Sequence, residues 1–324
     1  MSDAQVFARY LLLERVATGS MAEVFRARAL GAGPEVPDVA VKRLLPGLAS
    51  DGWAARQYLA EIEALRRIDH PAVVRLLAEG RGHGLPYIAM PWLGGVNLRQ
   101  LYNGLAGLAG PAGSGAMAPP LQLAVALAIA AQVADGLASA HQQGVIHRDL
   151  SPTNVQISNT GQVVIIDFGI AQVHGLPPHD GEERMPGKWA YASPEQRLGQ
   201  PLDHRTDLFA LGLLLRELVS GQGPDGQSDD HRQRLMVDNP TLQHLLDSLL
   251  AAEPNQRPDE AREAGVTLAK LSKTYGDIDV PMNLKNLLSL LPERPPAPPW
   301  TAAELRGEAV TQPHLDPDAT LIRM

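Results

Sequence analysis

Alternating apolar and polar positions characterise the N-terminal part of the chain. Residues 10–16, 22–29 and 39–44 each alternate with the period of two that is typical of a β-strand, and turn residues separate them. Residues 53–68 instead place apolar side chains three and four positions apart, which predicts a helix. Residues 85–98 begin with another strand pattern. Together these patterns predict an antiparallel sheet accompanied by one helix.

The middle of the chain carries two further apolar patterns. Residues 121–133 form the longest apolar segment, which is too short to span a bilayer and contains two glutamines. We therefore predict a helix that is buried in a protein core. Two short apolar runs, 154–158 and 163–166, are joined by turn residues at 159–161 and predict a β-hairpin.

Two parts of the chain lack such patterns. Residues 103–120 are rich in glycine, alanine and proline, and we predict a flexible insertion without a function of its own. Beyond residue 275 a last short helix is expected over 284–291, and polyproline II structure over 292–299. The end of the chain, 300–324, is thinly apolar and is expected to be disordered.

Composition narrows the possible classes of protein. The chain has 324 residues, of which 44% are hydrophobic and 20% charged, as in an ordinary soluble globular protein. Its net charge of −8 argues against nucleic acid or an anionic membrane as the main partner. The absence of cysteine excludes disulfides and thiolate nucleophiles. We expect a cytoplasmic protein without a signal peptide or transmembrane segment.

The polar residues on either side of the predicted hairpin carry the candidate chemistry. Asp149 and Asn154 come at the start of its first strand, and Asp167 follows its second strand, so the hairpin would bring them together. Phosphoryl transfer with Mg²⁺ needs oxygen ligands that hold the metal against phosphate oxygens. It also needs a separate carboxylate that receives the proton of the attacking hydroxyl. The three residues supply both kinds of group.

These segments resemble a known family. The triplet HRD at 147–149 with Asn154, followed by DFG at 167–169, resembles the catalytic loop and the metal loop of a eukaryotic-type protein kinase. The motifs described below continue the resemblance in unbroken order over residues 10–273. The whole set is similar to the eukaryotic-like (Hanks-type) Ser/Thr protein kinases of bacteria. The resemblance implies that ATP and Mg²⁺ are the cofactors and that the γ-phosphate passes to protein hydroxyls.

The resemblance also implies a fold and its boundaries. The expected class is α+β, a two-lobed kinase fold with a small β-rich N-lobe and a larger helical C-lobe. The N-lobe would cover about 10–90 and the C-lobe about 94–273, after a lead-in over 1–9. Residues 274–324 would then be a Pro-rich, flexible tail.

The lysine of the segment VAVK, Lys42, stands on a strand otherwise suited to burial. Taken alone, it could be a solvated edge lysine. The resemblance implies that it binds the α- and β-phosphates and is held by Glu61 from the next helix. Glu63 is the rival carboxylate, but residues two apart on a helix point in different directions.

Residues 17–24 align with the loop that covers the phosphates in this family. Only the middle glycine is kept, as Gly19, while Ala17 and Ala22 replace the others, so we expect a stiffer loop. A plain hairpin turn is the alternative interpretation.

The segment after residue 85 resembles the strand and hinge that hold adenine. Met90 would be the gatekeeper, and the Pro91 carbonyl and the Leu93 N–H would bond the adenine edge. The nucleotide-binding residues implied by the resemblance are Val16, Gly19, Val24, Ala40, Lys42, Glu61, Met90, Pro91, Leu93, Asn154 and Asp167. Of these, Asn154 and Asp167 would bind the metal, and Asp149 would be the catalytic acceptor of the proton.

Two motifs of the C-lobe would be architectural. The triplet 193–195, SPE, stands where the family has APE, and Glu195 should pair with Arg257. Asp207 should anchor the backbone of the catalytic loop.

One departure from the family pattern concerns catalysis. Ser151 stands where the family has a lysine that neutralises the γ-phosphate, and Lys188 stands where it has a threonine. The resemblance implies that these positions face each other, and we predict that Lys188 is a catalytic residue that supplies the missing charge. The alternative is a solvated Lys188 and an impaired enzyme.

A second departure concerns activation. No serine or threonine lies between residues 169 and 191, so the usual activating phosphosite is missing. Asp180, Glu182 and Glu183 could partly substitute with fixed negative charge. We predict activity without phosphorylation of this segment; the alternative is a solvated acidic loop.

Other functions remain as alternatives. Ala17, Ala22 and Ser151 favour a pseudokinase that acts as a scaffold, and a small-molecule phosphotransferase would share the carboxylate–asparagine loop. Pro152 matches the Ser/Thr pattern better than the tyrosine pattern. Self-phosphorylation at Thr301, Thr311 or Thr320 of the tail could recruit a phosphothreonine-reading domain.

Overall fold

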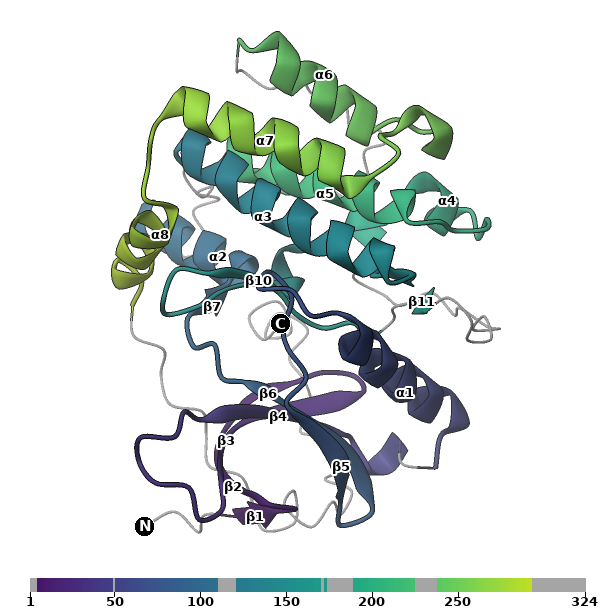
Figure 1. Ribbon diagram of the computed structural model, residues 1–324, viewed down its shortest axis with the longest axis vertical. Helices are drawn as coiled ribbons and strands as arrows, with labels where there is room; N and C mark the ends of the chain where they lie inside the picture. The colour runs from purple at the N-terminus through teal and green to yellow at the C-terminus, as the bar shows by residue number, and fades with distance from the viewer. Residues whose placement is uncertain are drawn as a thin grey trace. The chain divides into compact units, whose positions relative to one another are not determined.

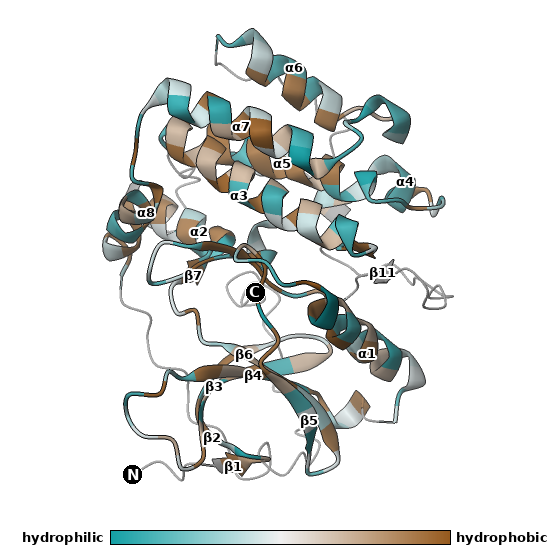
Figure 2. Ribbon diagram, in the orientation of Figure 1, coloured by the Kyte–Doolittle hydropathy of each residue, from teal (hydrophilic) through white to brown (hydrophobic). Residues whose placement is uncertain are grey.

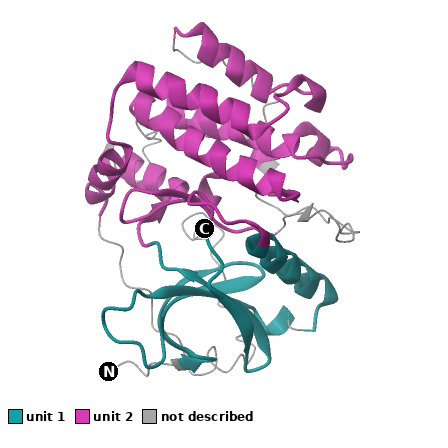
Figure 3. Cartoon of the chain, in the orientation of Figure 1, with its two compact units in different colours: residues 1–66, 74–93, 293–324 teal, residues 67–73, 94–292 magenta. Residues whose placement is uncertain are grey.

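The chain forms two compact units, one built on a β-sheet and one built mainly of helices (Figure 1, Figure 3). The computed structural model describes residues 5–48, 50–109, 121–169, 172–173, 189–224 and 238–292. Of the described residues, unit 1 comprises those before residue 67 together with 74–93, and unit 2 comprises 67–73 together with those from 94 to 292. The predicted α+β class, with a β-rich part and a helical part, is confirmed.

Unit 1 contains one antiparallel sheet in the strand order β1-β2-β3-β4-β6-β5. Its strands are β1 (Gln5–Phe7), β2 (Tyr10–Thr18), β3 (Ala22–Ala29), β4 (Val39–Leu44), β5 (Ala78–Gly82) and β6 (Leu85–Pro91). The strands predicted from alternation are confirmed. Within the expected lead-in over residues 1–9, residues 5–7 form β1, which pairs with β2, and Phe7 is fully buried.

The two faces of this sheet have different roles. Phe25, Val41 and Ala89 are cross-strand neighbours on β3, β4 and β6, and they belong to the buried apolar cluster of unit 1. Side chains alternate along a strand, so Lys42 on β4 points to the opposite face. The helix of unit 1, α1 (Gly52–Arg67), contacts β4 through a hydrogen bond from the Tyr58 hydroxyl to the Lys42 carbonyl at 2.6 Å.

Unit 2 is organised around one buried helix, α3 (Leu123–Gln142), which packs against α5 and α7 (Figure 1, Figure 2). The other helices are α2 (Leu98–Ala109), α4 (Pro194–Arg197), α5 (Arg205–Ser220), α6 (Pro240–Leu249), α7 (Ala261–Tyr275) and α8 (Val280–Ser289). Within the described part of the chain, α3 alone is long and apolar enough to cross a membrane, but 72% of its most apolar window is buried. The predicted core helix is therefore confirmed.

Short strands and turns complete unit 2. Its strands are β7 (Val96–Asn97), β8 (Val145–Ile146), β9 (Val155–Ile157), β10 (Val163–Ile165) and β11 (Gln172–Val173). Its 3₁₀ turns are Pro152–Asn154, Trp189–Tyr191 and Pro254–Gln256, and unit 1 has a 3₁₀ turn at Pro46–Leu48. The predicted hairpin is confirmed, because β9 and β10 pair antiparallel with Ile165 opposite Val155. Gly161 makes the turn with a φ of 80°, a conformation that favours glycine.

The predicted flexible insertion over residues 103–120 was wrong at its start, because α2 continues to Ala109. Leu98, Leu101, Tyr102 and Leu105 recur at helical spacing and are all buried. Their contacts outweigh the weak helix propensity of the glycines between them. Residues 110–120 lie outside the described residues.

The predicted flexible tail was also wrong over its first residues. The last short helix exists, but as α8 it begins earlier than expected, where the Asp279 carboxylate accepts a hydrogen bond from the Met282 N–H at 3.0 Å. Leu284 of α8 is fully buried. A Cβ added at Gly161 would overlap the Pro281 backbone, so α8 packs directly on the turn of the β9–β10 hairpin. Residues 293–324 lie outside the described residues.

Candidate active site

Asp149 and Asn154 form a hydrogen-bonded pair in the loop before β9. The Asn154 side-chain N–H₂ donates to the Asp149 carboxylate at 2.9 Å and to the Asp149 backbone carbonyl at 2.8 Å. The 3₁₀ turn over Pro152–Asn154 places the asparagine there, and the Asn154 N–H donates to the Ser151 carbonyl at 2.9 Å. The amide nitrogen of buried Asn154 faces Asp149, and its oxygen Oδ1 accepts a long hydrogen bond of 3.5 Å from the Thr153 hydroxyl. An amide oxygen has two lone pairs, so Oδ1 can still bind a metal.

Asp167 follows β10 and is joined to this pair through the backbone. The Ile166 N–H donates to the Asn154 carbonyl at 2.9 Å, so the residue after Ile166 lies next to the asparagine. Asp167 has a φ of 65°, in the left-handed region, and its carboxylate accepts the Gly169 N–H at 3.1 Å. The hairpin therefore brings Asp149, Asn154 and Asp167 to one end of β9 and β10, as its pattern predicts.

The donor set suits Mg²⁺ carried by a nucleotide. Asn154 and Asp167 offer a neutral amide oxygen and a carboxylate, both hard oxygen ligands of the kind that Mg²⁺ prefers. The described part of the chain contains no group of three or more His, Cys, Asp or Glu side chains that could hold a metal ion. Two protein ligands fit a metal whose remaining positions are filled by phosphate and water.

Asp207 at the start of α5 anchors the backbone of the same loop, as predicted. The N–H groups of His147 and Arg148 each donate to its carboxylate at 2.8 Å. The His141 ring nitrogen Nε2 lies 2.8 Å from the same carboxylate. Burial works to raise the pKa of Asp207, but the hydrogen bonds and charges of His141 and His147 together outweigh it and hold that pKa below its ordinary value. The anchor is therefore an ionised carboxylate.

Two buried rings pack beside this loop. The rings of His147 and Phe168 are fully buried, with centroids 4.6 Å apart. The Asp149 N–H points at His147 Nδ1, at 3.2 Å. His147 thus contacts Phe168 through its ring and the backbone of Asp149, the candidate proton acceptor, through Nδ1.

In unit 1, Lys42 and Glu61 form the predicted ion pair. The Lys42 ammonium lies 2.6 and 2.7 Å from the two carboxylate oxygens of Glu61 on α1. Only 13% of the Lys42 side chain and 3% of the Glu61 side chain are exposed, which contradicts the solvated edge lysine. Glu63 instead lies 3.7 Å from Arg66, so the choice between the two glutamates was correct.

The other nucleotide-binding residues implied by the resemblance also lie in unit 1. Val24 pairs with Lys42, and Met90 with Ala40, so these four side chains share one face of the sheet. The Gly19 N–H donates to the Ala22 carbonyl at 2.8 Å and closes a tight turn between β2 and β3. The remaining members lie at the ends of two strands, with Val16 in β2, Pro91 last in β6 and Leu93 two residues beyond it.

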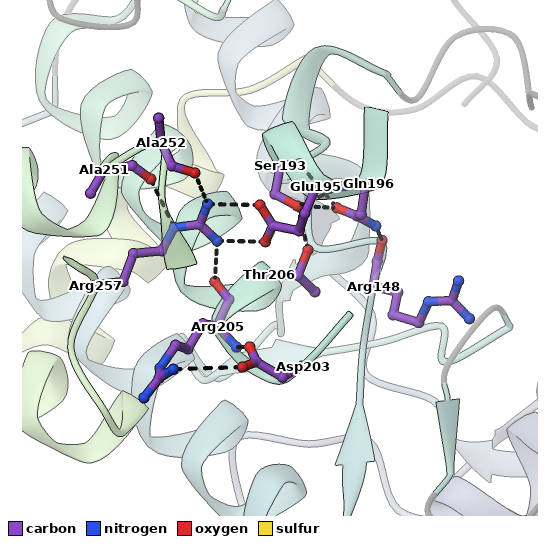
Figure 4. Close-up of polar contacts among 10 residues, drawn as sticks. All are labelled: Arg148, Ser193, Glu195, Gln196, Asp203, Arg205, Thr206, Ala251, Ala252 and Arg257. Carbon is purple, nitrogen blue, oxygen red and sulfur yellow. Dashed lines mark hydrogen bonds and ion pairs between the residues drawn. The ribbon is translucent and has the colours of Figure 1, made fainter. Parts of the chain in front are cut away.

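Glu195 and Arg257 make the predicted buried ion pair in unit 2 (Figure 4). Two parallel hydrogen bonds of 2.6 and 2.8 Å join the guanidinium to the carboxylate. The guanidinium also donates to the carbonyls of Ala251, Ala252 and Arg205 at 2.9, 3.1 and 2.9 Å. Burial works to raise the pKa of Glu195, but the hydrogen bonds and charge of Arg257, together with hydrogen bonds from the backbone and from Ser193, outweigh it and lower that pKa.

The pair proposed for the γ-phosphate can be described only in part. Ser151 is buried, and its hydroxyl lies 2.8 Å from the Thr153 hydroxyl. Lys188, the acidic residues at 180, 182 and 183, and the tail threonines lie outside the described residues, so the expectations about them stay predictions.

Sequence reasoning missed two groups of residues in unit 2. His141 supports Asp207 from the last turn of α3, and Gln196 of α4 donates to the Arg148 carbonyl at 2.8 Å. Arg99 of α2 pairs with buried Glu217 of α5 at 2.8 Å. Tyr191 completes this second group, with hydrogen bonds to both. The one available signal was Glu217, a lone acid in the apolar run of α5.

Comparisons with known proteins agree with this geometry. The sequence model of the protein kinase domain matches residues 10–266. MasK, a tyrosine-protein kinase of Myxococcus xanthus, is 31% identical, and the match covers 82% of this chain and 40% of MasK. PkaA, a serine/threonine-protein kinase of Streptomyces coelicolor, is 32% identical, with 78% of this chain and 48% of PkaA covered. The chain thus spans less than half the length of these curated relatives.

A solved structure shows the same fold. The PknI kinase domain of Mycobacterium tuberculosis superposes with a TM-score of 0.61 at 27% identity, over 83% of this chain and 98% of that domain. The predicted two-lobed kinase fold is confirmed. We conclude that the chain belongs to the protein kinase family, in its Hanks-type bacterial branch.

Proposed function

We propose that the protein transfers the γ-phosphate of ATP, with Mg²⁺, to serine or threonine hydroxyls of proteins. The observation that supports this most directly is the joint position of Asp149, Asn154 and Asp167. Asn154 binds the Asp149 carboxylate through its side chain and accepts the Ile166 N–H through its backbone. One asparagine thus links the candidate proton acceptor to the candidate metal ligand.

In this mechanism the substrate hydroxyl oxygen attacks the γ-phosphorus and the bond to the bridging oxygen of ADP breaks. Asp149 receives the proton of the hydroxyl, and the Asn154 amide preserves the orientation of its carboxylate. Asn154 Oδ1 and Asp167 would hold Mg²⁺, which supplies neutralisation of phosphate charge. Lys42, oriented by buried Glu61, would bind the α- and β-phosphates.

Serine or threonine is the proposed acceptor. Pro152 lies in the 3₁₀ turn before Asn154, at the place where the Ser/Thr pattern has proline. MasK is named a tyrosine-protein kinase, whereas PkaA and PrkC of Bacillus subtilis are named serine/threonine-protein kinases. Analysis of the phosphorylated amino acid in the product decides between the two.

The test uses the full chain, purified and treated with a phosphatase that is then removed. With labelled ATP and Mg²⁺ we expect label on the protein itself and on an added protein substrate, as phosphoserine or phosphothreonine. A chelator should abolish the transfer. Mass spectrometry should find phosphate on the tail threonines, Thr301, Thr311 or Thr320, where a phosphothreonine-reading domain would bind.

Two results of this test would contradict the proposal. Activity that requires a second kinase or a partner would reject the proposed independence from activation-segment phosphorylation. A complete absence of transfer would mean that the protein is a pseudokinase that acts as a scaffold. This is the alternative that Ala17, Ala22 and Ser151 favour.

We also propose that Lys188 replaces the lysine missing at position 151. Ser151 has no charge, and its hydroxyl is engaged with Thr153. A charged donor to the transferred group is worth about 10²–10³ in turnover, so Lys188→Ala should lower kcat by about that factor. Steady-state rates check this, with exposed Lys270→Ala of α7 as the matched control. Undiminished turnover of Lys188→Ala would reject the exchange, whereas restored turnover in Lys188→Thr with Ser151→Lys would support it.

A further inference from the structure

The peptide group that joins Arg148 to Asp149 is held at both of its ends. Its carbonyl oxygen accepts a hydrogen bond from the Gln196 side-chain N–H₂ at 2.8 Å. Its N–H points at His147 Nδ1, at 3.2 Å. Figure 4 shows Gln196 extending from the segment that contains Ser193 and Glu195 to the Arg148 carbonyl. Because this peptide precedes the Cα of Asp149, its orientation sets the direction of the candidate catalytic carboxylate.

Arg148 needs such support because its backbone is strained. Its φ is 66°, in the left-handed region, which costs a residue with a Cβ about 1–2 kcal/mol. The Arg148 N–H is held by the Asp207 carboxylate at 2.8 Å, and its carbonyl by Gln196. Strained conformations persist where the surroundings hold them from several sides. Loss of the carbonyl contact would let this peptide rotate and carry Asp149 with it.

The orientation of the Gln196 amide is determined by its other end. Its oxygen accepts hydrogen bonds from the Ser193 N–H at 3.0 Å and from the Ser193 hydroxyl at 3.3 Å. A backbone N–H can only donate, so this end must be the amide oxygen, and the N–H₂ faces Arg148. Ser193 is itself fully buried, and its hydroxyl lies 2.5 Å from the Thr206 hydroxyl at the start of α5.

We propose that Gln196 is a positioning residue for Asp149, which connects the short helix α4 to the catalytic loop. The proposal rests on the proposed phosphoryl transfer by Asp149. It assigns two functions to one amide: the oxygen completes the capping box of α4, and the nitrogen holds the strained loop. A displacement of α4, for instance when a protein substrate contacts it, would therefore change the orientation of the catalytic carboxylate.

Gln196→Glu separates the two functions. A glutamate is nearly the same size and keeps an oxygen for the Ser193 N–H, since Ser-x-x-Glu is itself a capping box. It removes the donor to Arg148 and sets a carboxylate oxygen against a carbonyl oxygen. A misplacement of about 1 Å costs about 10²-fold in rate, so we expect kcat to fall by about 10–100-fold. The KM for ATP should change much less than kcat, because most of the proposed nucleotide-binding residues, Lys42 among them, belong to unit 1.

The comparison variants are Gln196→Ala and Asn239→Asp. Asn239 caps α6 by accepting the Leu242 N–H at 2.9 Å, so Asn239→Asp makes the same change from amide to acid at another helix start. It should leave kcat unchanged. If Gln196 only capped α4, Gln196→Ala would be the more harmful variant and Gln196→Glu would behave as wild type, which would overturn the proposal.

Hydrogen–deuterium exchange gives a readout that does not depend on activity. Peptides that cover residues 147–155 should exchange faster in Gln196→Glu than in wild type and in Asn239→Asp. Exchange equal to wild type would overturn the proposal whatever the rate, and faster exchange with unchanged kcat would also overturn it. If the wild type transfers no phosphate, the proposed function fails, and the exchange result alone decides whether Gln196 holds the loop.

Discussion

Asp149→Asn is expected to lower phosphoryl transfer by about 10³-fold, within the range of 10²–10⁴ that a positioned general base contributes. The asparagine keeps an oxygen for the hydrogen bond that the Asn154 amide donates at 2.9 Å, so the loop should retain its geometry. It cannot accept the proton of the substrate hydroxyl. The loss should therefore fall on kcat, with binding of ATP and the thermal unfolding midpoint unchanged.

The matched control for this prediction is Asp135→Asn. Asp135 lies in the same unit, and 55% of its side chain is exposed, 3.2 Å from His70. We expect wild-type rates from it. Turnover of Asp149→Asn within about tenfold of wild type would show that the proton leaves by another route, because a lost general base costs more than that.

Arg257→Ala is expected to destabilise unit 2 by about 3–5 kcal/mol, the usual cost of removing one partner from a buried ion pair. None of the Arg257 side chain is exposed, and only 3% of the Glu195 side chain is exposed. The substitution removes the hydrogen bonds that Arg257 donates to this carboxylate and to the carbonyls of Ala251, Ala252 and Arg205. It also removes the guanidinium that lies 5.0 Å from the centroid of the Phe209 ring.

Denaturant unfolding measures this loss, with exposed Arg262→Ala of α7 as the control that should stay within about 0.5 kcal/mol. The pKa of Glu195 is lowered in the folded protein, so its contribution is present above the ordinary carboxyl pKa and is lost as the pH falls through the folded value. The difference between wild type and Arg257→Ala should therefore narrow below about pH 4. An equal difference at neutral and acid pH would contradict this account.

Local patterns were sufficient for much of the fold. The strands of unit 1 alternate clearly, and the hairpin that joins Asn154 to Asp167 has its turn glycine between two apolar runs. The ion pairs of Lys42 with Glu61 and of Arg257 with Glu195 were predicted because whole motifs matched a family pattern.

The errors arose where contacts between distant residues decide the structure. Strand β1 has three residues and is identifiable only by its pairing with β2. The helix α2 was misread because glycines and alanines near residue 103 were counted as loop, although Tyr102 and Leu105 continue a buried stripe. His141 and Gln196 contact residues 66 and 48 positions away, and neither has a neighbouring signal that indicates its partner.

The last helix sets a minimum length for a usable preparation of this protein. The sequence model of the kinase domain matches only to residue 266, and α8 lies beyond it. Leu284 of α8 is nevertheless fully buried, and the helix packs on α3 and on the hairpin turn at Gly161. A chain that ends just after α7 would expose the apolar surface that α8 covers on α3 and at the hairpin turn, and exposed apolar patches promote aggregation. Material intended for crystals or assays should therefore be expressed at least through Pro292.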